Sequence, residues 1–283
     1  MQVLVFGKTG QVARELQRYA GVTTLSRGDA DLSDPAACAE MIAQTNADAV
    51  INAAAYTAVD QAETDTKQAF RVNSEAPSAM ANAAAKRALP FLHISSDYVF
   101  DGSGTTPWVE DAPTGPLGVY GASKLAGEQG VRDANGPHAI LRTSWVVSAH
   151  GANFVKTMLR LGAERDALSI VADQIGAPTP ARDIAEALMQ MAAQLCADPS
   201  KSGTYHFAGM PDASWADFAR EIFAQSGTVC DVTDIPSSDY PTPAARPKNS
   251  RLDCTKVNTI FSISRPDWRV GLAGILSELK AET

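Results

Sequence analysis

The first ten residues constrain the fold more than any other stretch of the chain. Residues 2–6 (Gln-Val-Leu-Val-Phe) are β-branched, aliphatic or aromatic apart from the first, which predicts a short strand. The strand stops at Gly7-Lys8-Thr9-Gly10, and residues 11–17 favour a helix. This order predicts the first unit of an α/β fold with a parallel sheet covered by helices on both faces.

The glycine turn also predicts a ligand. Gly7 and Gly10 would let the backbone approach a pyrophosphate at the N-terminus of the next helix, where free N–H groups and the helix dipole favour anions. Ala13 stands where the dinucleotide fingerprint often has a third glycine. A purely structural turn would use the same residues. The place of this glycine turn directly after the first strand favours dinucleotide binding in a Rossmann-type domain.

The second strand predicts which dinucleotide is bound. Residues 22–25 form this strand, and Ser26-Arg27 follow it instead of the acidic residue that would bind a free ribose hydroxyl. Arg27 suits a 2′-phosphate, so NADPH is expected in preference to NADH. Asp31 and Leu32 are placed where they could contact the adenine.

The bulk composition excludes several classes of function. The chain has 283 residues and a net charge of −8, so it lacks the basic excess needed to bind nucleic acid or an anionic membrane. Its 4 cysteines show neither metal-ligand spacing nor a disulfide framework. No basic leader precedes an apolar stretch, and no apolar run could span a bilayer. We therefore expect a soluble, cytoplasmic protein.

Two further strand ends predict parts of a site. Residues 48–51 form a third strand, which ends in Asn-Ala-Ala-Ala-Tyr-Thr at 52–57. The small side chains of Ala54 and Ala55 would let a cofactor lie against the backbone, although a tight strand-to-helix crossing would explain them equally well. A long helix is then expected over 64–87, kinked at Pro77.

The fourth strand, 91–95, leads into Ser96 and Asp97. Ser96 could hydrogen-bond a substrate carbonyl, and Asp97 could accept from a sugar hydroxyl. Such residues more often form caps and turns. Their place between the cofactor loop and the helix near residue 120 favours a role in the site, because parallel sheets bind ligands at this edge.

Tyr120 and Lys124 are the predicted chemical centre. Residues 120–128 favour a helix, and residues four apart lie on one face of it. A nearby ammonium favours the phenolate, so Lys124 should lower the pKa of Tyr120 and let it exchange a proton with a substrate oxygen. A surface helix with an unrelated lysine is the alternative.

The second half of the chain is less regular. We expect residues 1–147 to form the NAD(P)-binding domain, and the chain to return to this domain near 165–195 and 228–254. Residues 148–283 are expected to form mainly a smaller α/β substrate-binding lobe. Trp145 follows a fifth strand at 139–141 and could pack on a sugar ring or in the core. Arg246 opens a cationic cluster suited to a diphosphate, or to a solvated loop.

Taken in order, these motifs resemble a known family. Gly-x-x-Gly-x-x-Ala, Asn-Ala-Ala-Ala, Ser-Ser-Asp-Tyr-Val-Phe-Asp-Gly and Tyr-x-x-x-Lys together resemble the extended short-chain dehydrogenase/reductases. Within that superfamily, residues 52–63, 142–146, 174–179 and 246–250 are similar to those of the dTDP-4-dehydrorhamnose reductases. The resemblance spans nearly the whole chain.

The resemblance implies hydride transfer from NADPH to C4 of dTDP-4-dehydro-L-rhamnose, giving dTDP-L-rhamnose. Tyr120 would protonate the carbonyl oxygen, Lys124 would hold the cofactor ribose and lower the tyrosine pKa, and Ser96 would orient the carbonyl. Asp97 and Trp145 fall at the family's substrate contacts. Its cofactor contacts fall on Gly10, Gln11, Val12, Asp31, Leu32, Ala55, Tyr56 and Thr57.

The sequence departs from the family at two positions and leaves alternatives open. The family commonly has threonine where Ser96 stands and histidine where Tyr56 stands. Tyr98 follows Asp97 where a dehydratase of this fold would carry glutamate. The nearer rivals are another nucleotide-sugar 4-ketoreductase or epimerase, and a non-catalytic NADP-binding subunit similar to the regulatory subunit of methionine adenosyltransferase.

The resemblance also bears on metal binding and on the oligomeric state. Some members of the family dimerise around Mg²⁺ held by glutamates, and Glu15 falls at one such position. The sequence identifies no complete ligand set, and both monomer and homodimer remain open.

Overall fold

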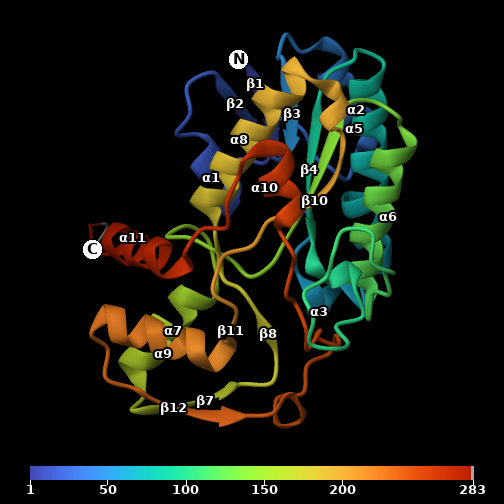
Figure 1. Cartoon of the computed structure of the whole chain (residues 1–283). Helices are drawn as coiled ribbons and strands as arrows, with labels where there is room; N and C mark the ends of the chain where they lie inside the picture. Colours follow the sequence, from blue (N-terminus) through green and yellow to red (C-terminus); the bar gives the residue numbers. More distant parts are fainter. Residues whose placement is uncertain (282–283) are drawn as a thin grey trace.

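A six-stranded parallel sheet forms the centre of the molecule. The computed structural model describes residues 1–281 (Figure 1). The strand order is β10-β5-β4-β3-β1-β2, and every pair in it is parallel. The carboxyl ends of the strands therefore meet at one edge, and the predicted α/β fold is confirmed. The strands are β1 (Val3–Phe6), β2 (Val22–Leu25), β3 (Ala49–Asn52), β4 (Phe91–Ser96), β5 (His138–Thr143) and β10 (Gly203–His206).

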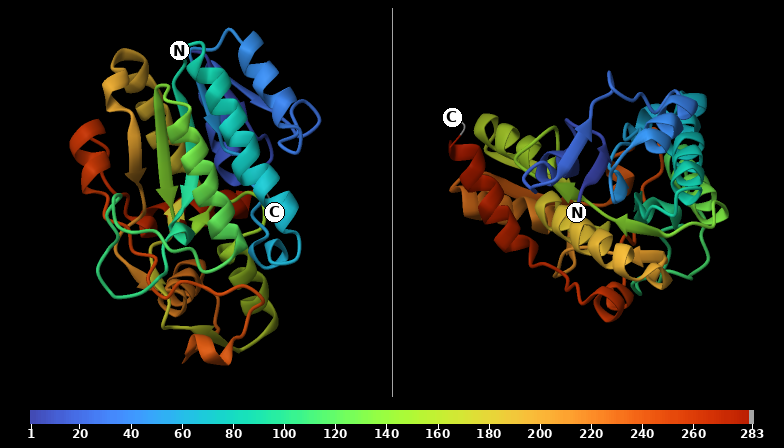
Figure 2. Two further views of the ribbon diagram at one scale, coloured as in Figure 1. Left: turned by 90° about the vertical axis from the view of Figure 1, so that its right-hand side faces the viewer. Right: turned by 90° about the horizontal axis from the view of Figure 1, so that it is seen from above.

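Helices cover both faces of this sheet (Figures 1 and 2). On one face α2 (Pro35–Gln44) packs on α5 (Ala76–Ala85), which packs on α6 (Val119–Asp133). On the other, α1 (Gln11–Leu16) packs on α8 (Ala181–Ala197). Successive side chains of β1 enter different cores, because strand residues alternate between the two faces. Val3 and Val5 enter the core with α8, and Leu4 and Phe6 enter the core with α5.

The helix expected over 64–87 is interrupted. It consists of α4 (Thr66–Phe70), a π-helical turn at Arg71–Glu75, and α5. Pro77 lies inside α5 and has no N–H to donate to the carbonyl of Asn73, four residues earlier. The helix widens into the π-helical turn just before this proline. The Asn73 side chain bonds both backbone groups of Tyr56, at 2.8 and 3.0 Å. The π-helical turn thereby fastens the loop after β3.

A smaller lobe lies beyond the carboxyl edge of the sheet (Figure 1). Its own core includes Phe218 and Trp268, both almost fully buried. β7 (Ala167–Val171) pairs with β12 (Asp231–Ile235) and not with the main sheet, whereas Leu252 and Cys254 lie in the core that the main sheet shares with α8. The last strand of the main sheet is β10. The other elements of this lobe and its junction are β6 (Val146–Val147), α7 (Phe154–Glu164), β8 (Ile175–Gly176), β9 (Thr179–Pro180), β11 (Ala213–Ser214), α9 (Trp215–Ser226) and α11 (Trp268–Ala281).

The remaining elements are short. They are α3 (Val59–Ala62), α10 (Thr255–Phe261), and 3-10 turns at Asp97–Val99, Pro199–Lys201 and Ser237–Asp239. Within residues 1–281, no helix has the length and apolar composition that a membrane crossing requires.

Candidate active-site cleft

A single cleft of about 1490 Å³ runs along the carboxyl edge of the sheet. It extends from the glycine turn, past the ends of β2, β3 and β4, to the start of α6 and the residues after β5. Most predicted site residues therefore lie on one surface. Those that line the cleft are Gly7, Gly10, Gln11, Val12, Arg27, Asp31, Leu32, Ala54, Ala55, Tyr56, Thr57, Ser96, Asp97, Tyr120, Lys124 and Trp145.

The glycine turn is shaped by close backbone contact. Gly7 has a φ of +111°, a conformation that side chains rarely adopt, and an added Cβ would lie 3.3 Å from the carbonyl carbon of Ala53. Gly10 is the N-cap residue of α1 and forms no side-chain cap. The turn leaves open backbone at the start of α1, as a bound pyrophosphate would need.

Arg27 and Asp31 stand together at the far end of the cleft. Arg27 Nε lies 3.0 Å from Asp31 Oδ2, and the arginine side chain is 78% exposed. The backbone and side chain of Ser33, followed by Arg27, lower the pKa of Asp31 to about 2. Asp31 is thus charged at neutral pH and holds the guanidinium at the cleft while leaving most of it accessible.

Tyr120 lies half-buried near Ser96 and Asp97. Burial, followed by the charge of Asp97, raises the pKa of Tyr120 to about 12, against an opposing hydrogen bond from Ser96. The expectation that Lys124 lowers this pKa is therefore wrong for the protein without cofactor. Tyr120 is a neutral phenol at physiological pH, which is the form that can donate a proton.

Lys124 is held against the sheet by residues of β4. Its Nζ donates to the backbone oxygen of Ile94 at 2.6 Å and lies 3.5 Å from His93 Nε2. The side chain is almost fully buried, and burial lowers its pKa to about 8 although Glu128 opposes the shift. Spacing along α6 placed the two residues on one face of the helix, but neighbouring strands decide where the ammonium lies.

Two buried polar atoms in the cleft have no partner among the described residues. They are Oδ2 of Asp97 and Oγ1 of Thr143. Burial raises the pKa of Asp97 to about 6, against the opposing hydroxyls of Ser250 and Ser96. Thr143 ends β5 directly opposite Ser96, and no sequence motif had marked it as a site residue. Both atoms are placed to bond a polar ligand.

Trp145 separates the cleft from the smaller lobe. It has a φ of +48°, and its ring stacks on Trp215 with centroids 3.6 Å apart and 12° between the planes. An added Cβ on Gly176 would lie 2.9 Å from the Trp145 ring, so the contact depends on that glycine. The exposed part of the ring forms a flat apolar wall of the cleft.

Arg246 is not among the residues that line the cleft. Its guanidinium pairs with Asp60 at 2.8 Å and donates to the Ala244 backbone oxygen at 3.1 Å. That Arg246 binds substrate stays a prediction, and the structure shows its guanidinium held by Asp60. The sequence showed a cation near the end of the chain but not the carboxylate from α3 that pairs with it.

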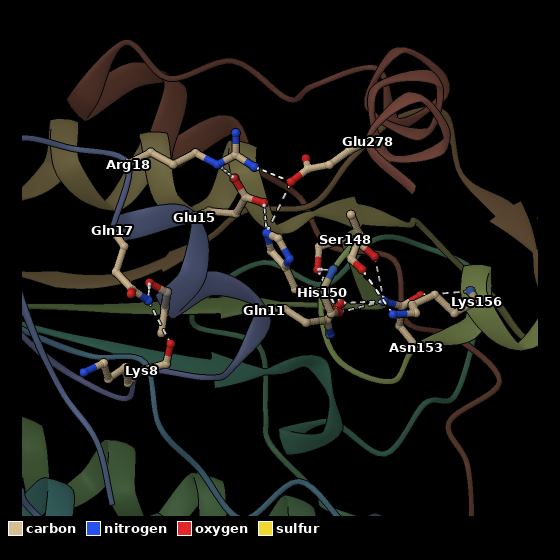
Figure 3. Close-up of polar contacts among 12 residues, drawn as sticks. Lys8, Gln11, Glu15, Gln17, Arg18, Ser148, His150, Asn153, Lys156 and Glu278 are labelled. Carbon is tan, nitrogen blue, oxygen red and sulfur yellow. Dashed lines mark hydrogen bonds and ion pairs between the residues drawn. The ribbon is translucent and has the colours of Figure 1, made fainter. Parts of the chain in front are cut away.

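Glu15 also lies outside the cleft, in an ion-pair cluster (Figure 3). Arg18 contacts Glu15 at 2.8 Å and Glu278 at 2.6 Å, and His150 Nε2 lies 3.5 Å from a carboxylate oxygen of each. Mg²⁺ prefers oxygen ligands in octahedral geometry and keeps several waters. A guanidinium that bridges both carboxylates, with an imidazole beside them, does not fit that ion.

Chelation with EDTA is therefore expected to leave turnover and melting temperature unchanged. The Arg18→Ala variant provides the comparison, because it removes the guanidinium that bridges both carboxylates and should let Mg²⁺ raise the melting temperature. Loss of wild-type activity in EDTA, with recovery on adding Mg²⁺, would contradict this.

Comparison with known proteins agrees with the geometry. Residues 1–281 match the family described as RmlD substrate binding domain. The dTDP-4-dehydrorhamnose reductase of Sinorhizobium fredii is 45% identical, covering 95% of this chain and 94% of its own length. That of Escherichia coli K12 is 40% identical, covering 100% and 99%. The crystal structure of the Bacillus anthracis dTDP-4-dehydrorhamnose reductase in complex with NADP is 32% identical, with a TM-score of 0.91 and coverage of 98% and 100%.

Proposed function

Because the chain belongs to the RmlD family, we propose that it reduces the C4 keto group of dTDP-4-dehydro-L-rhamnose to dTDP-L-rhamnose, using NADPH. One observation carries the proposal. Tyr120, a phenol that keeps its proton at neutral pH, stands beside Ser96 in a cleft continuous with the glycine turn. That arrangement suits protonation of a carbonyl oxygen next to a dinucleotide.

The cleft fits NADPH by its shape and its charge. An added Cβ at Gly7 would lie 3.3 Å from Ala53, so the glycine keeps the turn tight, and the exposed guanidinium of Arg27 suits a 2′-phosphate. NADPH, when bound, supplies the hydride. Lys124 would contact the ribose from the base of the cleft, while Ala54 and Ala55 leave space beside the backbone.

The polar residues at the end of β4 would bind and orient the sugar. Ser96 Oγ, which donates to Asp97 Oδ1 in the structure, would turn to donate to the keto oxygen, and Tyr120 would give its proton to the same oxygen. Asp97, which is ionised above about pH 6, would accept from a sugar hydroxyl. Thr143 offers a second unpartnered hydroxyl opposite Ser96, and Trp145 a flat surface for the ring.

The direct test is NADPH oxidation, followed by its absorbance, with dTDP-4-dehydro-L-rhamnose as substrate. The product should be dTDP-L-rhamnose, identified by chromatography against an authentic standard. The corresponding UDP sugar tests whether the base is recognised, and a 4-epimerase would instead interconvert sugars without net oxidation of NADPH. Tight NADPH binding with no turnover would favour a non-catalytic binding subunit and refute the proposal.

Cofactor preference has its own test in Arg27→Ala. The KM for NADPH should rise by about 10- to 100-fold, because a hydrogen bond to a charged group is worth about 1.5–3 kcal/mol. The KM for NADH should stay the same, since it has no 2′-phosphate. Arg160→Ala removes an exposed cation of α7 away from the cleft and is the control. An equal effect on both cofactors would count against 2′-phosphate recognition.

A further inference from the structure

A buried polar chain leads from the sheet to Lys124. It consists of Asn52 at the end of β3, His93 in β4, and Lys124 in α6, each at most 2% exposed. Asn52 and His93 are paired in the strand register. Asn52 Nδ2 lies 3.2 Å from His93 Nδ1, and His93 Nε2 lies 3.5 Å from Lys124 Nζ. Three elements thus place three nitrogen-bearing side chains in a row.

The orientation of the Asn52 amide fixes which nitrogen of His93 carries the hydrogen. The backbone N–H of Ala54 donates to Asn52 Oδ1 at 3.2 Å, so the amide NH₂ faces the imidazole. An NH₂ group can only donate, and His93 Nδ1 must therefore accept. Burial, followed by the charge of Lys124, lowers the pKa of His93 well below its usual value, so the ring is neutral and Nε2 bears the hydrogen.

This tautomer presents an N–H to Lys124. An ammonium has no lone pair and cannot accept that hydrogen, whereas a neutral amine can. The Ile94 backbone oxygen holds Nζ in place in either state. Glu128, one turn further along α6, favours the ammonium, but Arg142 neutralises this carboxylate with two bonds of 2.8 and 2.7 Å. Tyr120, one turn earlier on α6, is uncharged at neutral pH.

We propose that Asn52 and His93 are positioning residues that hold one imidazole tautomer against Lys124, and that this tautomer sets the pH above which Lys124 is no longer an ammonium. The inference rests on the proposed reductase function for its catalytic consequence. In the proposed reductase the Lys124 ammonium would donate a charge-assisted hydrogen bond to the cofactor ribose, which a neutral amine makes more weakly. Turnover should therefore fall as pH rises through the pKa of Lys124, which burial lowers to about 8.

The tautomer can be measured in the wild-type protein, with and without bound NADP⁺. The chain has 4 histidines, and ¹⁵N-histidine labelling reports the protonation of each ring nitrogen. The His93 signals are those lost in His93→Phe. We expect an unprotonated Nδ1 and a protonated Nε2 at neutral pH. The hydrogen on Nδ1 would overturn the proposal whether or not the protein reduces the sugar.

The kinetic consequence is tested with Asn52→Asp. The carboxylate would accept from Nδ1–H, Nε2 would then accept from the Lys124 ammonium, and the basic limb of kcat/KM should move up by about one pH unit, a tenfold change in proton affinity. His93→Phe keeps a ring but removes both nitrogens. If the aspartate acts through the tautomer, its effect disappears in the double variant. If the pH shifts of the two single variants simply add in the double variant, the aspartate charge acts on Lys124 directly, and the proposal is overturned.

Discussion

Tyr120→Phe is expected to lower kcat for NADPH-dependent reduction by about 10²–10⁴-fold, the usual contribution of a positioned proton donor. The phenol lies beside Ser96 in the cleft and keeps a transferable proton at neutral pH, because burial and then Asp97 raise its pKa to about 12. The dissociation constant of NADPH should stay within about twofold of the wild-type value, since phenylalanine keeps the ring. Initial rates and NADPH fluorescence titrations measure the two quantities.

The control for this substitution is Tyr240→Phe. Tyr240 is 63% exposed and does not line the cleft, so the same chemical change should leave kcat unaltered. If the Tyr120 variant turned over like the wild type, another group would have to supply the proton, and the assignment of the acid would be wrong.

Arg142→Met should cost about 3 kcal/mol of folding free energy, near the low end for breaking a buried ion pair, because Glu128 keeps the partly exposed Arg132 at 3.2 Å. Glu128 is fully buried and receives bonds from Arg142 at 2.8 and 2.7 Å and from Ser95 at 2.6 Å. The Arg142 guanidinium also lies 5.0 Å from the Phe100 ring centroid. Urea denaturation measures the loss as a lower midpoint.

The matched control is Arg160→Met, which breaks an exposed pair with Glu164 on α7. Pairs of that kind contribute about 0–1 kcal/mol, so a similar loss in both variants would contradict the argument. Adding Glu128→Gln to Arg142→Met should recover part of the loss, since the buried charge that has lost its main partner disappears.

The Arg142–Glu128 pair also predicts the direction in which folding stability changes with pH. Although burial opposes them, bonds from Arg142 and Ser95 hold the pKa of Glu128 below its usual value of 4.5. A depressed carboxyl pKa stabilises the fold above the unfolded-state value and loses that contribution as pH falls through the folded-state value. Below about pH 4.5, wild type and Arg142→Met should therefore converge in stability.

The sequence alone determined the fold class and the position of the cofactor cleft. Strand, glycine turn and helix are contiguous, and the ends of consecutive parallel strands must meet at one edge, so short motifs near residues 7, 27, 54 and 96 fall on one surface. Periodicity and turn residues are local properties, which a single sequence displays directly. The ends of a strand are also set by local residues: the sequence predicts a strand at 22–25, and β2 has these bounds.

The tertiary structure decided which of these side chains work together. Spacing showed that Tyr120 and Lys124 share a helical face, but the register of β3 and β4 puts Asn52 and His93 under the lysine. The sequence shows Arg246 only as a cation, whereas the structure shows that it pairs with Asp60, 186 residues earlier. Charge, burial and tautomer depend on atoms within a few ångströms. Those neighbours come from distant segments, and only the packing of the sheet and its helices brings them together.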